Sequence, residues 1–182
     1  RMSLEKPHSG LFSLIDSMEG NDFIGEEKIY VSRRTWTQSK SDNIGTDYTK
    51  ERMCMNEDEV VELFKNYGYK EVFCETLSMK EKIGLFRYAK YVAGCIGGGM
   101  SNVLFCKPDT KVISINSPEF FPINDRLKYA FIHTNLHMFD YTEFIDRKSG
   151  IITSDNALSI SGGMNSRWKV DMTELEKMLG KM

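Results

Sequence analysis

The chain has 182 residues, of which 41% are hydrophobic and 27% are charged, and its 24 basic and 26 acidic side chains give a formal net charge of −2. This length and composition can bury the core of one globular domain, which excludes a disordered tail. The near balance of charge gives no broad cationic surface, so neither nucleic acid nor an anionic membrane is expected as the main partner. No apolar run approaches the roughly 18 residues that span a bilayer, so membrane insertion of this chain is not expected.

Residues 1–27 mix glycine, serine and acidic side chains without a clear period, and we expect them to form a peripheral arm with a short helix around residues 11–15. Residues 28–182 are expected to form one domain. Its first strand is predicted at Lys28–Ser32, a short β-branched and aromatic run. The polar stretch from Arg34 to Cys54 predicts a long loop, of a length typical of loops that bind something or move.

Strands and helices alternate after this loop. Asn56 with Glu59, and Ser78 with Glu81, have the spacing of helix capping boxes, and Met79 is expected to face inward in the second of these helices. The elements expected here are a helix from Asn56 to Gly68, a strand over Tyr69–Cys74, a helix from Ser78 to Ala89, a strand over Tyr91–Ile96, a short helix over Ser101–Cys106 and a strand over Val112–Asn116.

The connections between these strands are too long for hairpins, and the strands are apolar on both faces. Both features predict a doubly wound α/β domain, in which helices cover both faces of a parallel sheet. The pattern is less regular beyond Pro118. The elements expected there are a helix near Asp125–Ile132, a strand around His137–Phe144, a strand over Trp168–Val170 and a terminal helix whose N-cap is Asp171.

Three successive glycines, Gly97, Gly98 and Gly99, stand between an expected strand and an expected helix. Residues without a Cβ let a ligand approach the backbone, and the free N–H groups and dipole of the following helix favour phosphate. In an open parallel sheet such a turn lies where ligands bind. The run fails the GxGxxG and GxxxxGK[ST] spacings, which argues against a nicotinamide-dependent oxidoreductase. A tight turn without a ligand is the alternative.

Arg33 and Arg34 directly follow the first strand, so at least one guanidinium is expected at the same sheet edge as the glycine run. Arginine can bind a diphosphate with two parallel hydrogen bonds. The alternative is a solvated pair without a role. Ser101 and Asn102, in the first turn of the next helix, either bond phosphate or ribose or merely cap the helix.

No metal site is expected. The acidic run from Glu57 to Glu59 begins a helix, where the helix dipole favours acidic residues, and His133 with His137 is a weak pair of ligands. The four cysteines form no CxxC pair, and we interpret them as free thiols of the core, which slightly favours a reducing compartment and leaves the localisation unknown.

Several of these motifs, in order, resemble glycosyltransferase family 61. The segment KIYVSRR is similar to the family's strand ending in Ser-Arg, and Arg52 to Asn56 is similar to its Arg-x-x-x-Asn stretch before a helix. LSMKEKIGLFRYAKYVAG looks like its Leu-Ser helix and apolar segment. The most specific piece, Gly-x-His-Gly-Ala-Gly-Leu-Ser-Asn, is matched by GCIGGGMSNVLF from Gly94 to Phe105. The closing RWKVDMTELEKML looks like the family's last strand and helix.

The resemblance implies the nucleotide-sugar-binding, Rossmann-like lobe of a two-lobed GT-B enzyme, which transfers a sugar from a nucleoside-diphosphate donor to a hydroxyl of a glycan or glycoprotein. It implies no cofactor or metal, and a second lobe or partner chain that supplies the acceptor side and the general base. The residues that it assigns to the donor are Arg33 as the catalytic group, with Arg34, Arg52, Gly97, Gly98, Gly99, Ser101, Asn102 and Glu119 in nucleotide or phosphate binding.

The chain departs from the family pattern at two positions. Ile96 stands where the family has histidine, and Lys82 stands where it often has glutamine. Loss of an imidazole contact to phosphate would cost roughly 1 to 3 kcal/mol. A non-catalytic α/β binding or scaffold module with a degenerate nucleotide site is therefore the alternative function.

Overall fold

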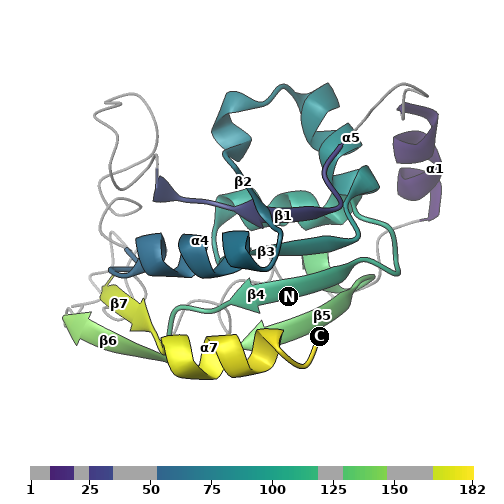
Figure 1. The fold of residues 1–182 in the computed structure, drawn as a ribbon. Helices are drawn as coiled ribbons and strands as arrows, with labels where there is room; N and C mark the ends of the chain where they lie inside the picture. Colours follow the sequence, from purple (N-terminus) through teal and green to yellow (C-terminus); the bar gives the residue numbers. More distant parts are fainter. Residues whose placement is uncertain (1–8, 19–24, 35–52, 119–128, 147–165) are drawn as a thin grey trace, which may run out of the picture.

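A computed structural model describes five stretches of the chain, residues 9–18, 25–34, 53–118, 129–146 and 166–182 (Figure 1). Residues 35–52 of the expected long loop, which include Arg52, lie outside the described residues, as does Glu119. Most of the helix expected near Asp125–Ile132 also lies outside them, and its end, residues 129–131, is helical.

Five parallel strands form the main sheet, in the order β2-β1-β3-β4-β5. Every neighbouring pair is parallel, as the register of each pair shows. The strands are β1 (Lys28–Val31), β2 (Lys70–Val72), β3 (Tyr91–Cys95), β4 (Lys111–Ile115) and β5 (Asn135–Phe139). The predicted parallel α/β architecture is confirmed, and the fold is Rossmann-like.

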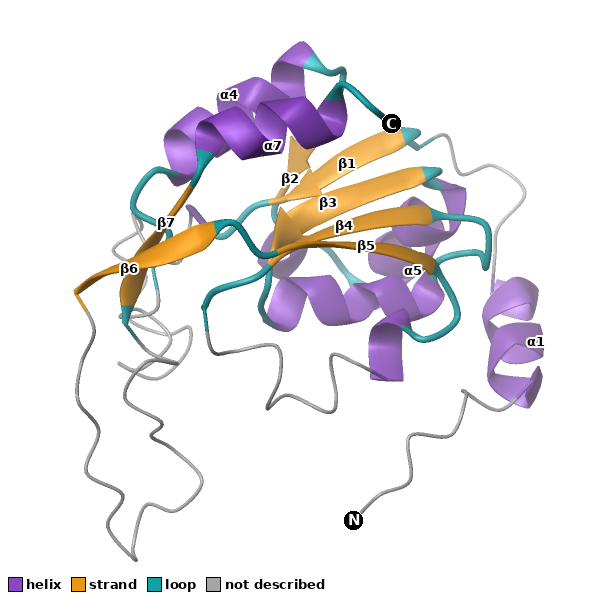
Figure 2. Cartoon of the chain, turned by 90° about the horizontal axis from the view of Figure 1, so that it is seen from below, coloured by secondary structure: helices purple, strands orange, loops and turns teal. Residues whose placement is uncertain are grey.

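Helices cover both faces of this sheet (Figure 2). On one face, α4 (Glu57–Asn66) and α7 (Met172–Leu179) bury Phe64 and Leu175 in one apolar layer. On the other, α5 (Met79–Tyr88) and the 3-10 helix η2 (Gly98–Phe105) bury Phe86 and Met100 in a second layer. A short 3-10 turn, η1 (Cys74–Thr76), follows β2. The alternating side chains of the strands supply both layers, which fixes the sheet between them.

A separate antiparallel pair, β6 (Thr142–Asp146) and β7 (Arg167–Val170), projects beyond the end of β5. The single strand predicted over His137–Phe144 is wrong, because the chain leaves the main sheet at Asp140 and pairs anew with β7. Two backbone bonds fix this departure, from Thr142 N–H to the Asp140 carbonyl at 2.8 Å and from Asp171 N–H to the Tyr141 carbonyl at 2.9 Å.

Two of the three predicted N-terminal helix caps form. The capping box of Ser78 and Glu81 forms, and the Asp171 carboxylate accepts from the first backbone N–H groups of α7. The capping box predicted at Asn56 is wrong. Its side chain instead bonds both backbone groups of Val170, at 2.9 Å each, and so ties the start of α4 to β7. This partner is distant in sequence, which a local pattern cannot reveal.

Two further predictions are corrected. The helix predicted over Ser101–Cys106 begins earlier, at Gly98, and is a 3-10 helix. Its tight turns are closed by bonds such as that from Met100 N–H to the Gly97 carbonyl, 3.1 Å. Met79, expected to face inward, is 57% exposed, because it lies in the first turn of α5 beyond the apolar layer. All four cysteines are buried, and none is in a disulfide.

The first helix, α1 (Ser9–Met18), contacts α5 on the outside of the second layer. Asp16 forms an ion pair with Arg87, which is buried, and the Phe12 ring lies 5.0 Å from the ring of His133. Part of the expected arm therefore packs against the domain.

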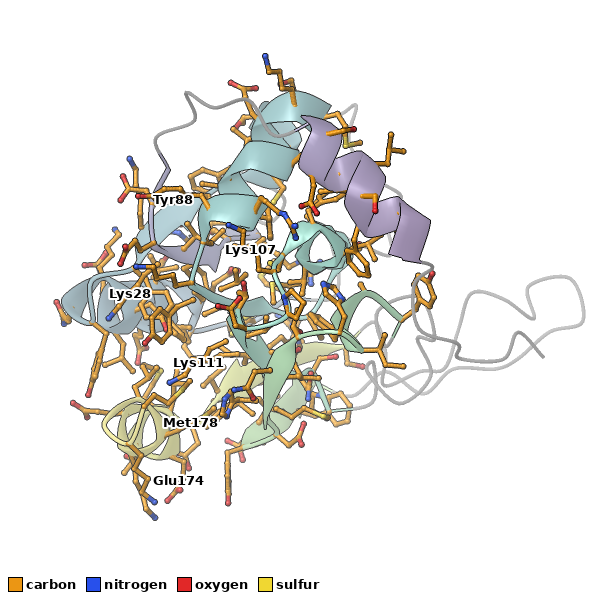
Figure 3. The ribbon with its side chains drawn as sticks, turned by 90° about the vertical axis from the view of Figure 1, so that its right-hand side faces the viewer. Lys28, Tyr88, Lys107, Lys111, Glu174 and Met178 are labelled. Atoms are coloured by element: carbon orange, nitrogen blue, oxygen red, sulfur yellow. The ribbon has the colours of Figure 1, made fainter. Side chains whose placement is uncertain are left out.

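The amino edge of the main sheet carries lysines. Lys28 and Lys111, the first residues of β1 and β4, point toward this edge (Figure 3). Their Nζ atoms lie 5.2 and 5.4 Å from the centre of the Tyr91 ring, within the range of cation–π attraction. The arginines and glycines singled out in the sequence follow the strands and therefore lie at the opposite, carboxyl edge.

We predict that Gly68→Ala lowers the free energy of unfolding by about 1 kcal/mol, because Gly68 ends α4 with a φ of +82°, where a Cβ is strained. No atom lies within 4 Å of an added Cβ, so the effect is purely conformational. Gly180→Ala, at the end of α7 with a φ of −66°, is the matched control and should change stability by less than about 0.5 kcal/mol. Equal effects in urea unfolding would contradict the explanation.

Candidate functional site

The candidate site lies at the carboxyl ends of β1 and β3, where the order of the sheet reverses. The chain passes from β1 outward to β2 and then returns to place β3 on the other side of β1. The connections after β1 and β3 therefore diverge. Open α/β sheets bind their ligands in the crevice outside the strand ends at such a switch point.

Arg33, two residues after β1, is buried at this edge of the sheet with 9% of its surface exposed. Its backbone N–H donates to Oε1 of Glu57 at 2.9 Å, and its Nη1 donates to the Ile96 carbonyl at 3.4 Å. A Cβ added to Gly97 would lie 3.2 Å from Arg33 Nε. The structure thus brings together Arg33 and the glycine run, as predicted for this edge of the sheet.

The three glycines differ in their surroundings, and none of them lies in the left-handed region of positive φ. A Cβ on Gly99 would come within 2.8 Å of Val31 Cγ1 in the core, and a Cβ on Gly97 would press on Arg33. Gly98 is exposed, and no atom lies within 4 Å of an added Cβ. Neither backbone conformation nor packing accounts for glycine at position 98, and its backbone is open to an approaching group.

The start of η2 lies directly on this turn. The first N–H groups of a helix have no partner within the helix, and they point toward its amino end. Ser101 Oγ donates to the Gly98 carbonyl, and Asn102 Nδ2 donates to the Gly99 carbonyl at 2.8 Å. Both side chains therefore close the first turn of η2 by bonding backbone carbonyls.

Arg34 is paired with two carboxylates. Its Nε donates to Oε1 of Glu71 in β2 at 2.8 Å, its Nη1 donates to Asp58 in α4 at 2.8 Å, and its Nη2 pairs with the second oxygen of Glu71. The hydrogen bonds that these carboxylates accept raise the pKa of Arg34. These contacts of Arg34 join α4 to β2.

Glu57 is the residue of this site that the sequence analysis missed. Only 4% of its surface is exposed, although it belongs to an acidic run at a helix start, which is typical of solvated residues. Burial raises the pKa of its carboxyl, while the Arg33 N–H and the charges of Arg33 and Arg34 oppose the rise. The sequence did contain a signal for this burial. Glu57 precedes the buried Val60 and Val61 by three and four residues, so it lies on the same face of α4 as they do.

The described residues contain no group of three or more histidine, cysteine or acidic side chains placed to hold a metal ion. His133 Nε2 lies 3.1 Å from the Cys106 carbonyl, on the α5 side of the sheet. Among the helices in the described stretches, none combines the length and apolar character needed to cross a membrane.

Comparison with known families identifies the class of this protein. The family model described as Glycosyltransferase 61 matches residues 4–113, more than half of the chain. This span contains β1, β3, Arg33 and the glycine run. The chain therefore belongs to glycosyltransferase family 61, and its general activity is glycosyl transfer. Searches of curated protein sequences and of solved structures gave no match.

We predict that Glu71→Gln lowers the free energy of unfolding at neutral pH by about 1 kcal/mol, because it breaks the paired hydrogen bonds with Arg34. Burial alone would raise the pKa of Glu71, but hydrogen bonds from Arg34 and Ser32 and the charges of Arg34 and Lys65 lower it overall. The stabilisation is therefore complete above the ordinary glutamate pKa and is lost as the pH falls through the lowered value.

Urea unfolding between neutral and acidic pH measures this effect. The difference between wild type and Glu71→Gln should shrink on acidification, while Glu62→Gln, an exposed carboxylate paired with Lys65, should follow the wild type closely. A difference that does not depend on pH would show that the ionised carboxylate is not the cause.

Proposed function

We propose that Arg33 and the turn Gly97–Gly99 bind the diphosphate of a nucleoside-diphosphate sugar, and that the protein transfers this sugar to a hydroxyl of a glycan or glycoprotein. One observation carries the proposal. The buried Arg33 side chain lies against Gly97 at the switch point of the sheet, beside the exposed backbone of Gly98. A cation and open N–H groups at one crevice suit a diphosphate.

The chemistry needs a stabilised leaving group. As the bond between the anomeric carbon and the diphosphate oxygen breaks, negative charge grows on the diphosphate, while the acceptor oxygen forms the new bond to carbon and gives up its proton. Fixed donors that require no rearrangement stabilise such a charge best. In our proposal Arg33 and the first N–H groups of η2 supply them without a metal ion, and the base that takes the proton belongs to a second lobe or partner chain of a GT-B enzyme.

The other residues near the site have supporting roles in this proposal. Glu57 positions Arg33 by accepting its backbone N–H, and Arg34 contributes charge at the rim while it joins α4 to β2. Ser101 and Asn102 set the first turn of η2. Arg52 and Glu119 remain residues that we predict to contact the donor.

The second candidate function is a non-catalytic binding or scaffold module, and the observation that favours it is Ile96 in place of the family's histidine. The side chain of Ile96 is wholly buried in the apolar layer with Phe86 and Met100. At this position the side chain therefore packs in the core and offers no polar group to a phosphate. Release of a nucleoside diphosphate from a nucleotide sugar by the purified protein would support the enzyme, and binding without any turnover in the presence of acceptors would support the module.

We expect Arg33→Ala to weaken binding of UDP or GDP, whichever the wild type binds, by about tenfold or more, the scale of a lost charge-assisted hydrogen bond. Calorimetric titration in EDTA measures it. Arg167→Ala, which removes an exposed arginine of β7, is the matched control and should bind as the wild type does.

Arg33 is buried, so Arg33→Ala could also weaken binding by destabilising the fold. Gly98→Ala provides a test without this effect. The added methyl group meets no atom within 4 Å and should leave the unfolding free energy unchanged. If the diphosphate contacts this backbone, the methyl group should still weaken binding severalfold. Wild-type affinity in both variants would remove the turn and Arg33 from the donor site.

A further inference from the structure

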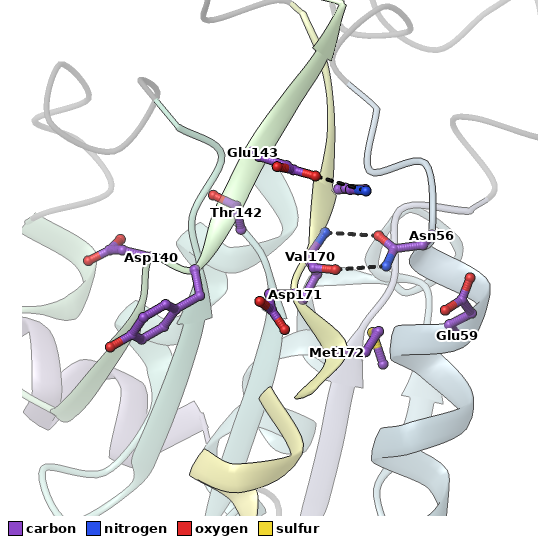
Figure 4. Close-up of a pocket in the computed structure, with 10 residues that line it drawn as sticks. Asn56, Glu59, Asp140, Thr142, Glu143, Val170, Asp171 and Met172 are labelled. Carbon is purple, nitrogen blue, oxygen red and sulfur yellow. Dashed lines mark hydrogen bonds and ion pairs between the residues drawn. The ribbon is translucent and has the colours of Figure 1, made fainter. Parts of the chain in front are cut away.

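A pocket of about 660 Å³ lies beyond the carboxyl end of β5, between the antiparallel pair and the first turns of α4 and α7 (Figure 4). Its volume is in the range of small-molecule sites. The lining residues used below are Asn56, Glu59, Asp140, Tyr141, Glu143 and Asp171. None of them was singled out for a ligand in the sequence, and none belongs to the Arg33 site.

Internal bonds fix the walls of this pocket. The two bonds between Asn56 and the backbone of Val170 join α4 to β7, and Glu143 pairs with Lys169 at 2.8 Å across the two strands. Asp171 accepts two N–H groups at the start of α7, and Asp140 accepts the side-chain amide of Asn116. These lining groups are already held in place before any ligand binds, which lowers the entropy cost of binding.

Two side chains remain available to a ligand. The Glu59 carboxylate is exposed and makes no hydrogen bond or ion pair with the described residues, and its charge acts on nearby Lys169. Tyr141 is 61% exposed, and its ring centre lies 5.5 Å from that of Phe139. A wall that combines an aromatic ring with acceptor oxygens can contact both the C–H face and the hydroxyl groups of a sugar ring.

The charge of the pocket limits the ligand. Four carboxylates, from Glu59, Asp140, Glu143 and Asp171, face one lysine. An anionic group such as a phosphate is repelled here. Ionised carboxylates only accept hydrogen bonds, so they fit a neutral ligand with several hydroxyl donors.

We propose that this pocket binds a neutral pyranoside, as a sugar of the acceptor that extends onto this lobe from the side supplied by the second lobe or partner chain. The pyranoside class follows from the pocket itself, and its assignment as acceptor rests on the proposed glycosyl transfer. The pocket adjoins the Arg33 site through two links. Asn56 directly precedes Glu57, which holds Arg33, and Asp140 bonds Asn116 at the end of β4, which neighbours β3.

Saturation-transfer NMR on the 182-residue chain tests the pocket, with the methyl glycosides of glucose, galactose, mannose and xylose as probes. Uridine and spermidine are included as probes of two other ligand classes for this pocket, a nucleoside and an organic cation. Glu59→Gln and Tyr141→Ala should each weaken binding of the preferred glycoside by about fivefold or more. Both side chains are exposed, so the fold should be retained. The matched controls are Glu176→Gln in α7 and Tyr88→Ala in α5, which lie outside the pocket.

The inference is supported if a glycoside binds, if both pocket variants weaken this binding and if the control variants bind it as the wild type does. The affinity for UDP or GDP should be unchanged in all four variants. No glycoside binding, binding that survives both pocket variants, or binding of only uridine or spermidine overturns it, whether or not a diphosphate binds. Glycoside binding without any diphosphate binding keeps the pyranoside pocket but overturns its role as acceptor site, because the donor function then fails separately.

Discussion

The burial of Arg33 is the constraint on which the rest of the site depends. A guanidinium taken out of water is costly unless acceptors meet it, and here the Ile96 carbonyl at the end of β3 is one of them. The same residue donates its backbone N–H to the buried carboxylate of Glu57, so β1, β3 and α4 meet at one arginine. Gly97 lacks a side chain where the arginine stem lies. A positive group is thereby fixed at the switch point of a parallel sheet, with little freedom to lose when an anion binds.

The arrangement of the carboxyl edge follows from this constraint. Glu57 begins α4, and the residue before it, Asn56, bonds the last residue of β7. One short segment thus positions Arg33 on one side and the wall of the acidic pocket on the other. The electrostatics of the two places are opposite, because an arginine and open N–H groups form the first and carboxylates dominate the second. This contrast suits the proposed reaction, in which an anionic donor and a neutral acceptor would bind at places of opposite charge.

Local sequence patterns predicted those parts of the fold that are determined locally. The caps at Ser78 and Asp171 formed because their partners lie within three residues. The cap at Asn56 failed because its partner lies 114 residues away in sequence. The turn between β5 and β6 was missed for the same reason, since pairing with β7 decides it. In the site, Arg33 and the glycines lie at the carboxyl edge as the strand ends predict. The role of Glu57 was missed because its partner, the backbone N–H of Arg33, lies 24 residues away in sequence.

The most direct test of the account is a titration of the isotope-labelled wild-type protein with UDP and GDP in EDTA, followed by the backbone amide signals and the arginine Nε–H signals in NMR spectra. The account predicts that one diphosphate shifts the amides of Gly97, Gly98 and Gly99 and the Nε–H of Arg33 most strongly. Shifts that avoid these groups and gather instead around α1 and α5, or no shifts with either diphosphate, would contradict the placement of the donor at the switch point of the sheet.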